Sequence, residues 1–115
     1  MLIIRPEQMH AFVEAGVRAL RDELTAHAQA CHTQAATSLG EAGLARVVGA
    51  TIDDAIEFGL AGLPAVCRLL DLVLVFGPPL PAAMRSVLVD PIHGTPARRL
   101  RKVWNGALFQ LEGQT

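Results

Sequence analysis

Residues 63–78 read Leu63-Pro64-Ala-Val-Cys-Arg-Leu-Leu-Asp-Leu-Val-Leu-Val-Phe76-Gly77-Pro78, the one segment apolar enough to form the centre of a fold. Proline is tolerated in the first turn of a helix, and a Gly-Pro pair ends a helix, so the segment predicts a buried helix over residues 63–76. Its valines also suit a strand, and periodicity alone leaves that alternative open. The length of the run and its Pro64 start favour the helix.

The segment before this one predicts two long helices. Pro6 opens the first, which is expected to reach about Ala30, with apolar residues at spacings of three and four. Gly16 lies on that apolar stripe and is expected to mark the close approach of a neighbouring helix. Ser38 and Glu41 have the spacing of a capping box, which places the second helix at about residues 39–58. Its expected buried side chains are Leu44, Val47, Val48, Ile52, Ala55 and Ile56.

The segment after the apolar run predicts two shorter helices. Prolines at 78, 79 and 81 form a stiff connector to a helix over residues 82–89. A loop over residues 90–94 follows, and Thr95 with Pro96 then caps and opens a last helix. Its expected buried side chains are Ala97, Leu100, Val103, Trp104, Ala107 and Leu108. The sequence therefore predicts an all-α fold, a single domain over residues 1–115 with four to five helices around residues 63–76.

Composition agrees with this fold and excludes some functions. The chain has 115 residues, of which 51% are hydrophobic and 4% aromatic, and this favours helices over a β-sandwich. Its net charge of −1 excludes a generally basic nucleic-acid binder, and no aromatic residues alternate with its basic cluster. The longest uncharged run is broken by glycine and proline and is shorter than the roughly 20 residues of a membrane span. We expect no nucleic-acid partner and no membrane insertion.

The two cysteines, Cys31 and Cys67, do not define a disulfide framework, and we expect buried, reduced thiols. The first residues, Met-Leu-Ile-Ile-Arg-Pro-Glu, lack the basic region and long apolar run of a secretory signal. We therefore expect a cytoplasmic protein.

The sequence contains two clusters of charged residues and one aspartate within the apolar segment. The basic cluster consists of Arg98, Arg99, Arg101 and Lys102, and it is either a solvated helix face or a docking patch for an acidic partner. The acidic cluster consists of Asp53, Asp54 and Glu57, for which a solvated or partner-facing surface is favoured over acid–base chemistry. Asp71 interrupts the apolar helix. A buried aspartate needs a partner, and the expected partners are Arg68, Arg5 or a C-terminal arginine.

Residues with reactive side chains are few. His27, Cys31 and His32 put a histidine and a thiol at helical spacing, but a metal site needs three or four ligands, and His10 and His93 are isolated in sequence. A cysteine nucleophile needs an orienting carboxylate and an oxyanion site, and the sequence indicates neither. We expect no catalytic, cofactor-binding or metal-binding residues. A small enzyme or metal-binding protein that uses His27 and Cys31 stays as a lower alternative.

Four elements of the sequence resemble a known family: Ile4-Arg-Pro-Glu-Gln-Met9, His27, Glu57-Phe58-Gly59, and Val66-Cys-Arg-Leu-Leu-Asp-Leu-Val-Leu-Val-Phe-Gly-Pro78. The family consists of small bacterial proteins of unassigned function, typically encoded beside type VI secretion genes, among VgrG spikes, PAAR-tipped proteins and toxin effectors. The resemblance covers about residues 3–104. The chain departs from the family after Pro78, where Pro79-Leu-Pro-Ala82 replaces an aspartate-rich, often aromatic turn.

The resemblance implies a protein-binding accessory, an adaptor or chaperone that holds a toxin effector or helps to load it onto the VgrG/PAAR spike. An immunity protein that binds and neutralises the toxin is the alternative. Neither role needs a catalytic residue. A homodimeric structural subunit is a third alternative, with Leu80, Leu88 and Leu111 as its expected apolar surface.

Overall fold

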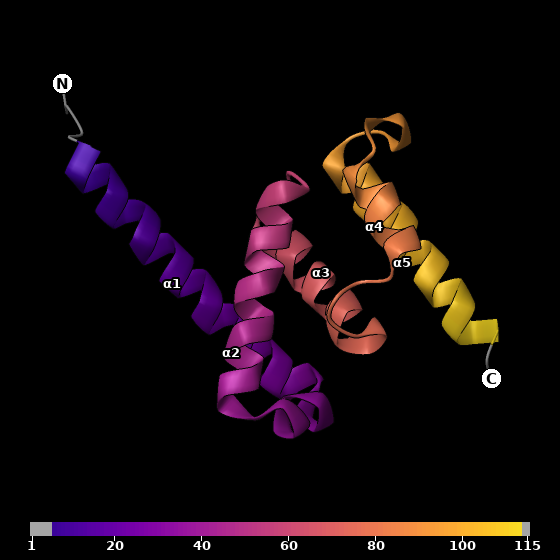
Figure 1. Ribbon diagram of the computed structural model, residues 1–115, viewed down its shortest axis with the longest axis horizontal. Helices are drawn as coiled ribbons and strands as arrows, with labels where there is room; N and C mark the ends of the chain where they lie inside the picture. The colour runs from indigo at the N-terminus through magenta and orange to yellow at the C-terminus, as the bar shows by residue number, and fades with distance from the viewer. Residues whose placement is uncertain (1–5, 114–115) are drawn as a thin grey trace.

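The apolar segment forms a helix with the boundaries that the sequence predicts. We describe a computed structural model in which the backbone of residues 6–113 and the side chains of residues 16–109 are defined. Its elements are α1 (Pro6–Cys31), α2 (Thr33–Glu57), α3 (Leu63–Phe76), α4 (Ala82–Val89), the short 3₁₀ helix η1 (Pro91–His93) and α5 (Pro96–Gly113) (Figure 1). Helices make up 85% of the structure, and the described residues contain no strand. The predicted all-α, single-domain class is confirmed.

Glycine and proline set the ends of α3. Pro64 lies in its first turn, and Gly62 and Gly77, the residues that flank the helix, both have a φ of 90°. Residues with a side chain rarely adopt that conformation, whereas glycine adopts it at little cost. Thr95 caps α5 as expected, since its hydroxyl accepts a hydrogen bond from the backbone amide of Arg98 at 3.3 Å.

Helix α3 lies at the centre of the fold. It packs against α1, α2 and α5, while α4 packs against α5. Its buried side chains belong to one hydrophobic cluster with fully buried residues of the other helices, which include Leu24 of α1, Val48 of α2 and Leu88 of α4. The buried residues of α3 are Val66, Leu69, Leu70, Leu72 and Val73. Leu69 and Leu70 are fully enclosed, so they are the middle of the hydrophobic core.

The second helix differs from its prediction. It begins at Thr33, with only His32 between it and the end of α1, and it is broken at Gly40, where φ is 73° and ψ is 173°. The predicted capping box of Ser38 and Glu41 is wrong because the helix starts earlier and its break falls on Gly40 instead. The predicted start near residue 39 corresponds to that break.

Several predicted positions of side chains are also wrong. Ile56 is 70% exposed and Leu108 is 44% exposed, although both were expected in the core. Ala97 is exposed as well. A Cβ atom built on Gly16 would meet no neighbouring atom within 4 Å, so no close helix approach explains that glycine. Cys31 is exposed and Cys67 is half-buried, and both are free thiols.

The expected dimer surface does not form as predicted. Leu80 and Leu88 are buried within the chain's own core, and the side chain of Leu111 lies outside the described residues. Leu80 and Leu88 therefore give no support to a homodimer.

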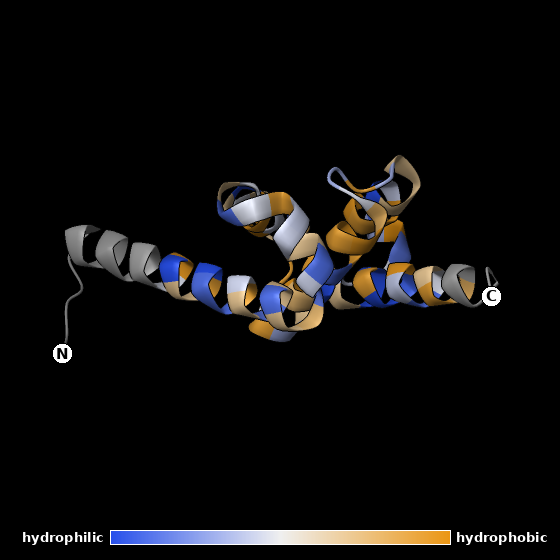
Figure 2. Ribbon diagram, turned by 90° about the horizontal axis from the view of Figure 1, so that it is seen from below, coloured by the Kyte–Doolittle hydropathy of each residue, from blue (hydrophilic) through white to orange (hydrophobic). Residues whose placement is uncertain are grey.

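The molecule is elongated. It measures 57 × 37 × 19 Å, and its radius of gyration is 15.7 Å, compared with about 13 Å for a typical domain of this length. Helices α1 and α5 reach the two ends of the long axis (Figure 1). Hydrophilic and hydrophobic residues both occur along the coloured parts of these two helices (Figure 2). Among the described helices, none combines the length and the apolar character that crossing a membrane requires.

Candidate functional site

Asp71 lies between two histidines. Its Oδ1 atom is 2.7 Å from Nε2 of His27 and 2.7 Å from Nε2 of His32. His27 belongs to the last turns of α1, His32 is the residue between α1 and α2, and Asp71 lies in the middle of α3. A carboxylate oxygen accepts hydrogen bonds, so both imidazoles donate from Nε2 to the same atom. We call these three residues the His–Asp–His cluster.

The turn between α1 and α2 builds this cluster. His27 and His32 are five residues apart, a spacing that does not place two side chains on one helical face. The helix ends at Cys31, however, and His32 has the non-helical angles φ −131° and ψ 53°. Its ring can therefore reach the same carboxylate as His27, and the two ring centroids lie 6.2 Å apart.

Among the described residues, the partners of Asp71 are two histidines rather than the predicted Arg68 or a C-terminal arginine, and Arg68 is exposed. Arg5, the other expected partner, lies outside the described residues. The Asp71 side chain is 21% exposed, so it is half-buried and water can reach it. The side chains of His27 and His32 are 26% and 20% exposed. The cluster is accessible at one side and packed at the other.

Cys31 extends the cluster by one contact. Its Sγ lies 3.8 Å from Nδ1 of His27, the ring nitrogen that does not face Asp71. Thiol, imidazole and carboxylate thus follow one another, and Asp71 supplies the orienting carboxylate that the sequence did not indicate. Cys67 is one helical turn before Asp71, and burial first, then the negative charge of Asp71, raises the pKa of the Cys67 thiol. Cys67 is therefore kept neutral beside the cluster.

The basic cluster divides into two parts. Arg99 is buried, and its Nη2 donates to the carbonyl oxygen of Phe58 at 3.1 Å. Arg98, Arg101 and Lys102 are exposed, and no carboxylate of the described residues pairs with them. Lys102 donates to Nδ1 of His93 at 3.0 Å. Only these three residues present their charge to solvent, so the expected patch is smaller than the sequence indicates.

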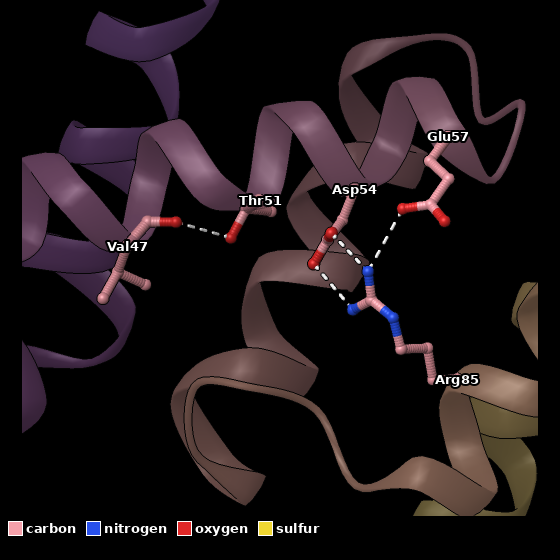
Figure 3. A network of polar contacts seen from close by, with 5 residues as sticks. All are labelled: Val47, Thr51, Asp54, Glu57 and Arg85. Carbon is pink, nitrogen blue, oxygen red and sulfur yellow. Dashed lines mark hydrogen bonds and ion pairs between the residues drawn. The ribbon is translucent and has the colours of Figure 1, made fainter.

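The acidic cluster is largely paired within the chain. Arg85 of α4 donates to both carboxylate oxygens of Asp54, at 3.0 and 3.4 Å, and to Glu57 at 3.1 Å (Figure 3). These contacts, above all the hydrogen bond to Asp54, raise the pKa of Arg85. Its guanidinium also lies 5.3 Å from the centre of the Phe58 ring. Asp53 is exposed. Asp54 and Glu57 therefore tie α2 to α4.

A small apolar cavity of about 50 Å³ lies between α3 and α5. Its lining residues are Asp71, Leu72, Val75, Phe76, Trp104, Ala107 and Leu108. Val75 and Leu108 are partly open to solvent at its edge, and the next residue, Phe109, is 79% exposed. Asp71 lines this cavity, so the His–Asp–His cluster and the cavity share one side chain.

Sequence reasoning found His27, Cys31 and His32 but not the convergence of the two histidines on Asp71. No local spacing could reveal it, because Asp71 lies 44 residues after His27 and 39 after His32. The available signal was Asp71 itself, because a carboxylate in an otherwise apolar helix requires a partner from elsewhere in the fold.

No protein-family model matches the chain, and neither does any curated protein or any solved structure.

Proposed function

We propose that this chain is a non-enzymatic accessory protein, an adaptor or chaperone, which binds a protein partner in a type VI secretion effector module. The observation that carries the proposal is the set of apolar and cationic side chains that the folded chain leaves in water, which includes Phe109, 79% exposed, and the exposed Arg98, Arg101 and Lys102. Aromatic and arginine side chains are enriched at protein-binding surfaces.

The exposed face of α5 is the part of this surface best suited to a partner. Arg98, Lys102 and Phe109 follow at spacings of four and seven, which places them on one side of the helix. Leu108 and Arg101 flank them. Exposed aromatic and arginine side chains are enriched among the residues that dominate binding energy in protein interfaces. The proposed surface of the partner carries an apolar pocket that receives Phe109. It also carries carboxylates that pair with Arg98, Arg101 and Lys102.

The resemblance over residues 3–104 supplies the class of partner, which is a secreted toxin effector or a VgrG/PAAR spike component. In this proposal the protein acts in the cytoplasm of the producing cell before secretion. An immunity protein would use the same kind of surface, so the two roles differ in what binding does to the toxin.

The test is co-purification of the tagged protein with the products of its neighbouring genes, followed by a toxicity assay and a secretion assay. The adaptor proposal expects a complex that leaves toxicity intact and is required for export. A complex that abolishes toxicity would instead establish the immunity role. If the protein associates only with copies of itself, or turns over a substrate without a partner, the proposal fails.

Two variants localise the surface. Phe109→Ser and the triple variant Arg98→Glu, Arg101→Glu, Lys102→Glu are each expected to weaken the complex at least about tenfold, because a dominant interface residue contributes 1–2 kcal/mol or more. Ile56→Ser is the matched control, since Ile56 is as exposed as Phe109 but lies on α2. Equal loss in the control would show that the α5 face is not the contact.

A further inference from the structure

We propose that His27, His32 and Asp71 bind one divalent first-row transition cation, for which Zn²⁺ is the best fit. Their three ligand atoms, Nε2, Nε2 and Oδ1, all lie within 4.8 Å of one another. They come from three elements, α1, the α1–α2 junction and α3. This inference does not depend on the proposed adaptor role.

The distances are close to those that a bound ion requires. Zinc binds imidazole nitrogen and carboxylate oxygen at about 2.0–2.2 Å, which separates the ligand atoms of a tetrahedral site by about 3.4 Å. Each Nε2 now lies 2.7 Å from Oδ1, as a hydrogen bond demands. Widening each contact by about 0.7 Å makes room for the ion. Rotation of the three side chains supplies this widening, because each is half-buried and none is enclosed in the core.

The donor set selects the kind of ion. Two imidazoles and one carboxylate suit zinc, iron, cobalt or nickel, whereas magnesium and calcium prefer oxygen ligands. Three protein ligands leave a fourth position for water, the arrangement found in open zinc sites. Between a fifth and a quarter of each ligand side chain is exposed, so the ion has a path from solvent.

Cys31 acts as a positioning residue for His27. Without an ion, the proton of His27 is on Nε2, and Nδ1 accepts from the Cys31 thiol across 3.8 Å. An ion takes the Nε2 lone pair, so the proton moves to Nδ1 of the same ring and no proton is released. The Nδ1–H group then donates to Sγ of Cys31. Such outer contacts orient a ligating imidazole and raise metal affinity.

The test uses the full-length chain, freed of metal with a chelator and titrated with Co²⁺ alone. We expect one Co²⁺ per chain, visible ligand-field absorption, and no thiolate-to-cobalt charge-transfer band, because no sulfur is a ligand. Saturating Zn²⁺ is expected to raise the thermal midpoint by about 5–10 °C, since an ion that binds only the folded state stabilises it. Absence of binding at about 1 mM Co²⁺, or a thiolate band, overturns the proposal.

Variants assign the ligands. His32→Ala and Asp71→Asn are each expected to lose at least about 100-fold in Co²⁺ affinity. Loss of an outer contact costs up to about 100-fold, and loss of a ligand is expected to cost at least as much. His93→Ala is the matched control, since His93 contacts Lys102 outside the cluster, and its affinity is expected to equal that of the unaltered chain. Loss in the control, or no loss in His32→Ala, contradicts the assignment.

Two further measurements separate the ligand role from folding. The circular dichroism of each ion-free variant reports whether it is folded, and if Asp71→Asn is not, His32→Ala decides. Cys31→Ala, which removes the acceptor of the Nδ1–H group, is expected to weaken binding about tenfold while it leaves the cobalt spectrum and the ion-free thermal midpoint unchanged. A changed spectrum would make Cys31 a ligand and overturn its positioning role.

Discussion

Arg99 of α5 donates a hydrogen bond to the backbone carbonyl of Phe58, at the end of α2, across 3.1 Å. The side chain is buried, and its Nε atom has no hydrogen-bond partner among the described residues. The contact satisfies a carbonyl that the end of α2 leaves unpaired within the helix. Arg99 therefore joins two distant elements and differs in role from the exposed cations on either side of it.

The first prediction separates Arg99 from its neighbours. Arg99→Glu is expected to lower the free energy of unfolding by about 3 kcal/mol, because it removes the donor to the Phe58 carbonyl and buries a carboxylate beside that oxygen. Arg98→Glu and Arg101→Glu are expected to change it by less than about 0.5 kcal/mol each, since both residues are exposed. Urea unfolding measures all three. Similar losses in all three would show that the whole basic cluster is structural.

The second prediction concerns Asp71. Asp71→Ala removes the acceptor of two half-buried imidazoles and is expected to cost about 1–2 kcal/mol, equivalent to a fall of about 5 °C in the thermal midpoint. The cost is smaller than for a fully enclosed aspartate because water reaches the cluster. Asp53→Ala is the control, since Asp53 is an exposed aspartate. An unchanged midpoint in Asp71→Ala would mean that the cluster does not hold α3 to α1.

The third prediction compares two glycines of α2. Gly40 has a φ of 73°, so Gly40→Ala is expected to destabilise the chain by about 1 kcal/mol or more through backbone strain. Gly49 lies in the regular part of the helix, and an added Cβ would meet no atom within 4 Å. Gly49→Ala is expected to stabilise by about 0.5–1 kcal/mol. Thermal unfolding of the pair checks the signs, and stabilisation by Gly40→Ala would show that the helix does not break there.

The fourth prediction follows from the raised pKa of Cys67. The raised pKa of Cys67 means that the folded state favours the neutral thiol. The contribution of this thiol to stability is therefore complete below the ordinary thiol pKa of about 8.5, and it is lost as the pH rises through the pKa of the folded state. The free energy of unfolding is therefore expected to fall above about pH 8.5. The chain has no tyrosine and one lysine, so few other side chains titrate in that range.

Cys67→Ala tests this assignment, because it is expected to remove most of the alkaline decline while Cys31→Ala retains it. Alkylation of the folded protein at pH 8 is expected to modify exposed Cys31 before Cys67. Faster labelling of Cys67 would contradict its burial.

Helix boundaries were the most predictable part of the fold, because proline and glycine act locally. Pro64, Gly77 and Pro96 fix the ends of α3 and the start of α5 through their own backbone preferences. The start of α2 was wrong because nothing near Thr33 signals a cap. No local signal marks the turn at His32, whereas the break in α2 falls on a glycine, Gly40, and lies close to the predicted start.

The candidate sites were less predictable because their partners are distant in sequence. The residue types of the His–Asp–His cluster were visible, but its geometry depends on the turn at His32 and the packing of α3. Arg99 was grouped with Arg98 by proximity in sequence. Neighbouring residues in a helix point about 100° apart, so one becomes buried while the other stays in water.

Helices that follow one another in the sequence pack against one another in most of this fold: α1 packs on α2, α2 on α3 and α4 on α5. A short loop joins the two helices of each pair, so little chain entropy is lost before the contacts between them form. Chains with such local contacts, of relative contact order about 0.07–0.12, fold in microseconds to milliseconds. A newly synthesised copy of this chain is thus expected to fold within milliseconds of leaving the ribosome.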